Sequence, residues 1–99
     1  MKEIKLTCKK VTFYFQKDEE AFFEWIKKIK CINFISAIGD ELYLHIKKKH
    51  ISDDDLRSLI GLFYRYKVDM KQLQIFLNKN NQKWFFESPK GFWHKRIFG

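Results

Sequence analysis

Aromatic and cationic side chains alternate along the C-terminal segment KWFFESPKGFWHKRIFG, residues 83–99. Rings that stack on bases, next to cations that neutralise phosphates, are what a single-stranded nucleic-acid binder needs. The same composition is typical of a protein interface, or of a strap that buries its rings and leaves its lysines in water. The candidate partner-binding residues are Trp84, Lys90, Phe92, Trp93, His94, Lys95 and Arg96.

We expect the rings of this segment to form mainly a strap, because so many large rings exposed on a small monomer would promote aggregation. The rim of such a strap would stay exposed, so a strap and a protein interface are compatible. The sequence therefore predicts a non-catalytic module that binds a protein partner or a second copy of itself. Nucleic-acid binding by the same segment is the alternative.

A second group of cations, Lys47, Lys48 and Lys49, precedes the acidic residues 53–55. These lysines are a candidate anion-binding site, or a solvated loop that the acidic residues partly neutralise. Consecutive carboxylates on a helix project about 100° apart. The acidic residues therefore diverge and predict a charged helix start instead of a cation site.

The sequence holds no recognised catalytic, metal or cofactor motif. His45, His50 and His94 lack the spacing of zinc ligands. The glycines are too scattered for a phosphate loop, and no serine has a base beside it in the sequence. We expect no cofactor and no metal. Because side chains can meet only in the fold, an enzyme is the third alternative.

Composition sets the broad class. The chain has 99 residues, of which 45% are hydrophobic and 18% aromatic, and this predicts one domain, 1–99. Its formal net charge of +8 favours acidic partners without defining a site. The distant Cys8 and Cys31 predict neither a disulfide framework nor a metal knuckle. With no signal peptide or membrane-spanning run in the sequence, we expect a cytoplasmic protein with reduced thiols.

The N-terminal half predicts a strand, a helix and a hairpin. Ile4, Leu6 and Cys8 alternate as in a strand. A change of parity after Lys10 predicts a bulge or a hairpin, and we favour one bulged strand that continues to residue 15. Residues 18–30 have the periodicity of an amphipathic helix, with Asp18 as its N-cap. Residues 32–47 predict two strands joined around Gly39 and Asp40 in a type II′ turn.

The C-terminal half begins with the clearest helix, where Ser52 and Asp55 resemble a capping box. Residues 70–77 fit a helix or a strand, and we favour a helix. Residues 92–98 are expected to be extended. Together these elements predict an α+β fold: a two-layer sandwich with a β-α-β-β-α core and a C-terminal helical and aromatic extension. A fourth strand would make it ferredoxin-like, a fold that hosts many functions.

The stretch DLRSLIGLFYRYKVDMKQLQIFLN, with the WF and FWHKRIFG that follow, resembles small uncharacterised bacterial proteins of similar length. The resemblance covers about the C-terminal half of the chain. It implies a bacterial and cytoplasmic origin, and it carries no fold, ligand, activity or site residue.

Overall fold

A three-stranded antiparallel sheet in the order β1-β3-β2 lies at the centre of the fold. The computed structural model describes residues 3–9, 11, 13, 15–88 and 90–99. The strands are β1 (Ile4–Lys9), β2 (Ile32–Ile38) and β3 (Glu41–Ile46).

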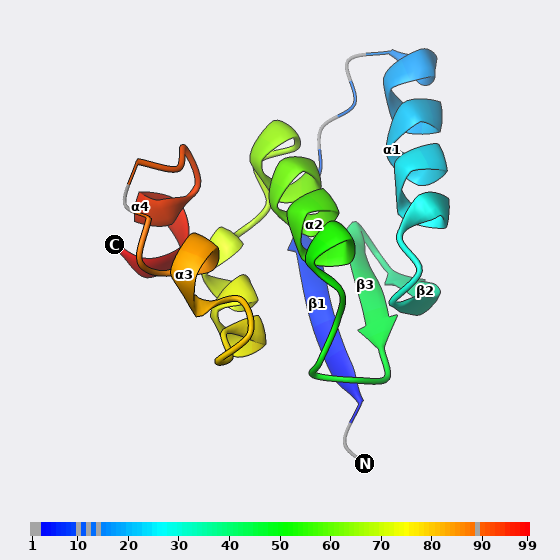
Figure 1. Cartoon of the computed structure of the whole chain (residues 1–99). Coiled ribbons are helices and arrows are strands. Elements are labelled where there is room, and N and C mark those ends of the chain that lie inside the picture. The colour runs from blue at the N-terminus through cyan, green and yellow to red at the C-terminus, as the bar shows by residue number, and fades with distance from the viewer. Residues whose placement is uncertain (1–2, 10, 12, 14, 89) are drawn as a thin grey trace.

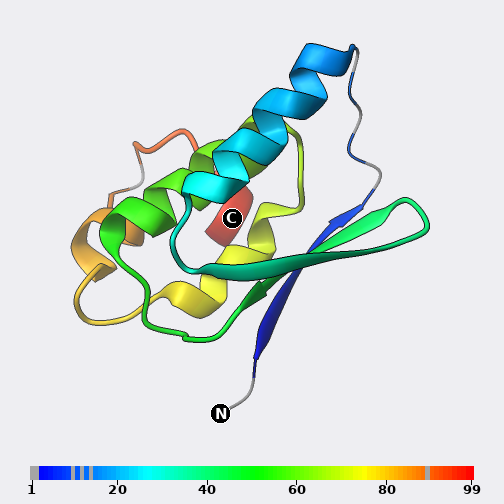
Figure 2. The same cartoon turned by 90° about the vertical axis from the view of Figure 1, so that its right-hand side faces the viewer.

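Two long helices lie on one face of the sheet, and shorter helices follow beside the second of them (Figures 1 and 2). The arrangement confirms the predicted α+β fold with a β-α-β-β-α order. The helices are α1 (Gln16–Lys28), α2 (Asp53–Arg65), the 3-10 helix η1 (Met70–Phe76), α3 (Gln82–Phe85) and α4 (His94–Phe98).

Strand β1 is shorter than the sequence predicted. It ends at Lys9, and among the described residues Val11 and Phe13 are not in a strand, so the predicted bulged continuation is wrong. Residues 10, 12 and 14 lie outside the described part of the chain. The Phe13 ring meets Phe22 of α1 at 5.3 Å between centroids and Tyr66 at 6.1 Å. Ring packing against the helices replaces strand pairing here.

The hairpin forms as predicted. Ile38 faces Glu41, which leaves a loop of two residues, and Gly39 has a φ of +62°. Among the described non-glycine residues only Lys67 has a positive φ, so Asp40 does not. A positive φ at the first loop position alone is the pattern of a type II′ turn.

Helix α1 begins at Gln16, with Phe15 at the N-cap position, so the prediction of Asp18 as N-cap is wrong. Asp18 lies in the first turn, where its charge suits the positive end of the helix dipole. The predicted apolar face is confirmed, because Phe22 and Ile26 are buried.

Helix α2 has half of the predicted capping box. The Ser52 hydroxyl accepts a hydrogen bond of 3.1 Å from the Asp55 N–H. The Asp55 carboxylate accepts instead from the N–H groups of Lys30, at 3.2 Å, and Cys31, at 2.9 Å. It therefore ties the start of α2 to the turn that follows α1.

Residues 70–76 form a helix, as favoured, but one of 3-10 type that lies against the outer edge of β1. Gln72 reaches that edge with its side-chain amide. Its Oε1 accepts from the Thr7 N–H at 2.7 Å, and its Nε2 donates to the Thr7 carbonyl at 2.8 Å. One side chain thus takes the place of a strand, and no fourth strand forms in the described residues.

A single hydrophobic cluster joins the sheet to every helical part of the chain. None of the helices in the described residues is long and apolar enough to cross a membrane. The largest fully buried side chains are Phe22, Phe63, Phe76, Phe85, Leu6, Leu44, Ile46, Leu56, Leu59, Leu62, Leu73 and Ile97.

Candidate binding surface

The inner side of the C-terminal segment closes the core. Phe85 and Ile97 are fully buried, and Trp93 is only 8% exposed. The Phe85 ring lies 5.7 Å from Trp93 and 5.0 Å from Phe98. Residues 94–98 reach these positions as helix α4, so the expected extended conformation is wrong. A helix places Ile97 one turn from Trp93, and both side chains then point inward.

Trp84 lies between the core and the surface. The guanidinium of Arg57 sits 4.0 Å from the centre of its ring. Its indole Nε1 is buried and has no hydrogen-bond partner among the described residues. Trp84 also meets Trp93 edge-on at 6.0 Å. Arg57 therefore covers one face of the Trp84 ring.

The outer side of the segment carries an exposed cluster. Phe92 is 59% exposed and meets Tyr64 of α2 edge-on at 4.6 Å between ring centroids. The Arg96 guanidinium of α4 lies 5.0 Å from the same Tyr64 ring. We call Tyr64, Phe92 and Arg96 the aromatic–arginine cluster. It joins three separate parts of the chain: a helix, a loop and the last helix.

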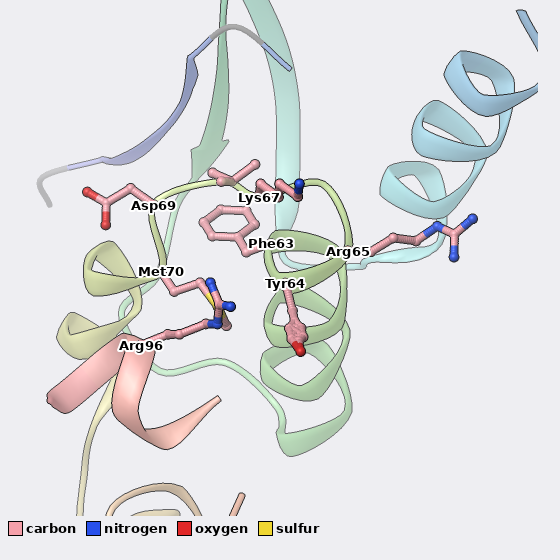
Figure 3. Close-up of a pocket in the computed structure, with 8 residues that line it drawn as sticks. Phe63, Tyr64, Arg65, Lys67, Asp69, Met70 and Arg96 are labelled. Carbon is pink, nitrogen blue, oxygen red and sulfur yellow. The ribbon is translucent and has the colours of Figure 1, made fainter. Parts of the chain in front are cut away.

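A hollow of about 640 Å³ adjoins this cluster (Figure 3). Arg96 extends toward Tyr64 and Met70 across it, whereas Arg65 points away toward α1. Its lining residues combine apolar walls with several cations and one carboxylate: Phe63, Tyr64, Arg65, Lys67, Val68, Asp69, Met70 and Arg96.

The remaining candidates of the segment divide between the two sides. Lys90 and Lys95 are exposed, and in the chain they stand two residues before Phe92 and one residue before Arg96. His94 is half-buried, and its Nε2–H donates to the Phe86 carbonyl at 2.7 Å. His94 therefore fixes the fold of the segment, while the exposed cations are free to meet a partner.

The lysines of the predicted anion site lie elsewhere. Lys47 and Lys48 line a second hollow of about 390 Å³, together with Lys30 and His50, and Lys49 is exposed beside them. This hollow includes the first residues of α2, and the first hollow includes the last ones. A helix of 13 residues is about 20 Å long, so the two basic regions lie at opposite ends of α2.

The fold brings together a serine, a histidine and a carboxylate that sequence reasoning missed. The Ser36 hydroxyl lies 2.7 Å from His45 Nε2, and His45 Nδ1 bonds the Glu3 carboxylate. Phe34 stacks on the His45 ring with 4.0 Å between centroids. The predicted hairpin held a signal for this contact, because strand alternation puts Ser36 and His45 on the same face of the sheet.

Ser36, His45 and Glu3 are connected like the nucleophile, base and orienting carboxylate of a catalytic triad. Acyl transfer also needs N–H groups that are free to stabilise the negatively charged oxygen of the intermediate. The two-residue loop makes Ile38 and Glu41 a hydrogen-bonded pair, and by alternation Ser36 and Tyr43 form another. The Ser36 N–H is therefore engaged with β3. The Ser36–His45–Glu3 chain fastens side chains across the open sheet face.

Thiol and metal chemistry receive no support from the geometry. Burial raises the pKa of the Cys8 and Cys31 thiols to about 12, and the nearby Asp55 carboxylate adds to the rise at Cys31. Both thiols are therefore protonated at neutral pH. In the part of the chain that the structure describes, no three His, Cys, Asp or Glu residues gather as metal ligands would.

Comparison with known proteins gives no relative to set beside this site. No protein-family model matches the chain, and neither the curated proteins nor the solved structures hold a significant match. A functional interpretation must therefore come from the geometry of the chain itself.

Proposed function

We propose that the chain is a small binding module whose aromatic–arginine cluster receives an acidic segment of a partner protein. The observation that carries the proposal is the contrast between adjacent rings: Phe92 is 59% exposed and Trp93 only 8%. Trp93 is part of the core, whereas most of the Phe92 ring meets solvent. An exposed ring beside a tyrosine and an arginine has the composition of an interface hot spot.

The charge around the cluster favours an acidic partner. The Arg96 guanidinium lies over the Tyr64 ring, 5.0 Å from its centroid. A guanidinium next to a ring can still bind a carboxylate in a bidentate manner through its N–H groups. Three cations, Arg65, Lys67 and Arg96, and one carboxylate, Asp69, line the adjacent hollow, so positive charge predominates there. The net charge of +8 would draw an acidic segment to the whole chain.

We base the setting of this module on the resemblance of the C-terminal half, residues 55–78 with the WF and FWHKRIFG that follow, to small uncharacterised bacterial proteins. That resemblance supports a bacterial origin and a place in the cytoplasm. A partner would then be another cytoplasmic protein, or a second copy of this chain.

A peptide array tests the proposal directly. We expect the chain to prefer synthetic peptides that combine Asp or Glu with Phe, Trp or Leu. Phe92→Ala and Arg96→Ala should each weaken binding at least about tenfold, the usual effect of removing a hot-spot side chain. Arg96→Lys should also weaken it, because lysine keeps the charge but lacks the planar guanidinium that binds a carboxylate in a bidentate manner.

Lys79→Ala is the matched control, because it removes an exposed cation from the turn before α3. It should leave peptide binding unchanged within about twofold. Circular dichroism should show all variants folded, since the altered side chains lie at the surface. Equal binding by wild type, Phe92→Ala and Arg96→Ala would contradict the proposal.

Single-stranded nucleic acid is the second candidate, favoured by the exposure of Phe92 next to Lys90, Lys95 and Arg96. A ring that stacks on a base with cations around it is a typical arrangement for this ligand. A thymidine oligonucleotide separates the two functions. Retention of the oligonucleotide that falls steeply with salt would favour nucleic acid. Absence of retention at low salt would exclude it.

A further inference from the structure

The outer edge of β2 presents backbone groups that no other described strand pairs. The sheet order places β3 on one side of β2, and in the described residues nothing pairs with its other side. Figure 2 shows the hairpin with β2 in front of the rest of the sheet. A row of free N–H and C=O groups is specific for one kind of partner, another extended strand.

The side chains of β2 suit a second copy of the same strand. The strand INFISAI has no charged residue, in a chain whose net charge is +8. Most approaches of two such chains bring like charges together, but two β2 edges meet without any. Phe34 and Ile38 are 48% and 72% exposed on this strand. We propose that two copies of this chain associate by antiparallel pairing of their β2 strands.

Backbone geometry selects the register of this pairing. Ile38, Ser36 and Phe34 alternate as the residues that bond to β3, starting from the two-residue loop. Ile35 and Ala37 therefore point their N–H and C=O groups outward. A two-fold axis at Ser36 lets Ile35 of one copy exchange both hydrogen bonds with Ala37 of the other.

The same register matches the exposed side chains. It sets Phe34 of each copy directly opposite Ile38 of the other, on the open face of the sheet. These are positions without hydrogen bonds between the strands, where facing side chains come closest. The two-fold axis produces this Phe34–Ile38 pair twice, so Phe34 and Ile38 of both copies become covered. The bulge at residues 32–34 and the turn at Gly39 limit the ladder, so the dimer should be weak and concentration-dependent.

A cysteine placed on the symmetry axis tests the register. In a Cys31→Ser background, Ser36→Cys should form a disulfide with itself between two chains under mild oxidation. Facing residues at such a position have Cα atoms about 4.5 Å apart, within reach of a disulfide. Cys8 is fully buried and should not compete. Thr7→Cys on β1, whose edge Gln72 occupies, is the matched control and should stay monomeric.

Analytical ultracentrifugation tests the association without a cross-link. The average mass should rise from one toward two chain masses with concentration. Ile38→Lys or Phe34→Lys should weaken the dimer at least about tenfold by placing two cations in the interface. A wild type that stays monomeric while Ser36→Cys fails to cross-link would overturn the inference. So would a dimer that persists in both lysine variants but is lost in Phe92→Ala, since it would then use the other surface.

Discussion

The two edges of the sheet differ in whether other parts of the chain cover them. Along β1, the Gln72 amide makes two hydrogen bonds to Thr7, and η1 carries it there. Helix α4 supports η1 in turn, because Gln74 Nε2 donates to the Ile97 carbonyl at 2.6 Å. Along the outer edge of β2, no described residue makes hydrogen bonds of the kind that Gln72 makes to Thr7. The C-terminal third of the chain thus covers one edge of the sheet, and within the described residues the other edge has no strand beside it.

This difference shows why similar apolar residues have different roles. Trp93 is buried against Trp84 and Phe85 of α3. Ile97 is buried in α4, which packs against η1. Phe34 and Ile38 are exposed because the hairpin extends beyond the helices, with its second face open. Changes on the covered side should reduce stability, and changes on the open side should alter association.

Trp93→Ala should have the largest effect. It removes a large buried ring at the centre of the C-terminal cluster, and such truncations cost about 3–5 kcal/mol. Urea unfolding at equilibrium measures the free energy of unfolding. Phe92→Ala, the exposed neighbour, should change it by less than about 0.5 kcal/mol. Similar losses of unfolding free energy in Trp93→Ala and Phe92→Ala would show that the buried ring does not stabilise the fold more than the exposed one.

Gln72→Ala should have an intermediate effect. It leaves the N–H and carbonyl of Thr7 without their partner, and an unsatisfied, partly buried polar group costs about 1–3 kcal/mol. Amide hydrogen exchange should also speed up at Thr7 more than elsewhere in β1. Lys71→Ala, its exposed neighbour, is the control. Unchanged exchange at Thr7 in Gln72→Ala would show that the amide does not protect this edge.

Phe34→Lys and Ile38→Lys should have the smallest effect on stability. Ile38 is 72% exposed, so at a protein concentration where the chain is monomeric Ile38→Lys should shift the free energy of unfolding by less than about 0.5 kcal/mol. Phe34 is half-exposed and stacks on His45, so Phe34→Lys should cost up to about 1 kcal/mol. Thermal unfolding followed by circular dichroism measures the change. A loss above about 1 kcal/mol would mean that these residues stabilise the monomer, and the two edges would then be less different than the geometry indicates.

Most of the secondary structure could be predicted because its signals are local. The alternation through Leu6 and Cys8, the stripe of Phe22 and Ile26, and the turn at Gly39 each follow from a few neighbouring residues. The end of β1 at Lys9 could not be predicted from neighbouring residues. The Phe13 ring that follows it packs on Phe22 of α1 and on Tyr66, and Tyr66 lies 53 residues further along the chain.

The candidate site was only half visible in the sequence. Phe92 and Arg96 stood among the predicted contact residues, but their partner Tyr64 belongs to α2, and only folding brings it to them. Trp93 stood in the same set and is buried instead. Alternation of rings and cations along a segment does not say which ring faces inward, because that depends on the surface against which the segment folds.

The sequence alone determined the class of elements and their order, because hydrophobic periodicity and turn residues act over a few positions. Tertiary structure decided which edge of the sheet is covered, which rings meet solvent, and that Ser36, His45 and Glu3 meet. These outcomes depend on contacts such as Gln72 with Thr7, at a separation of 65 residues, whose geometry exists only after the chain has closed around its core.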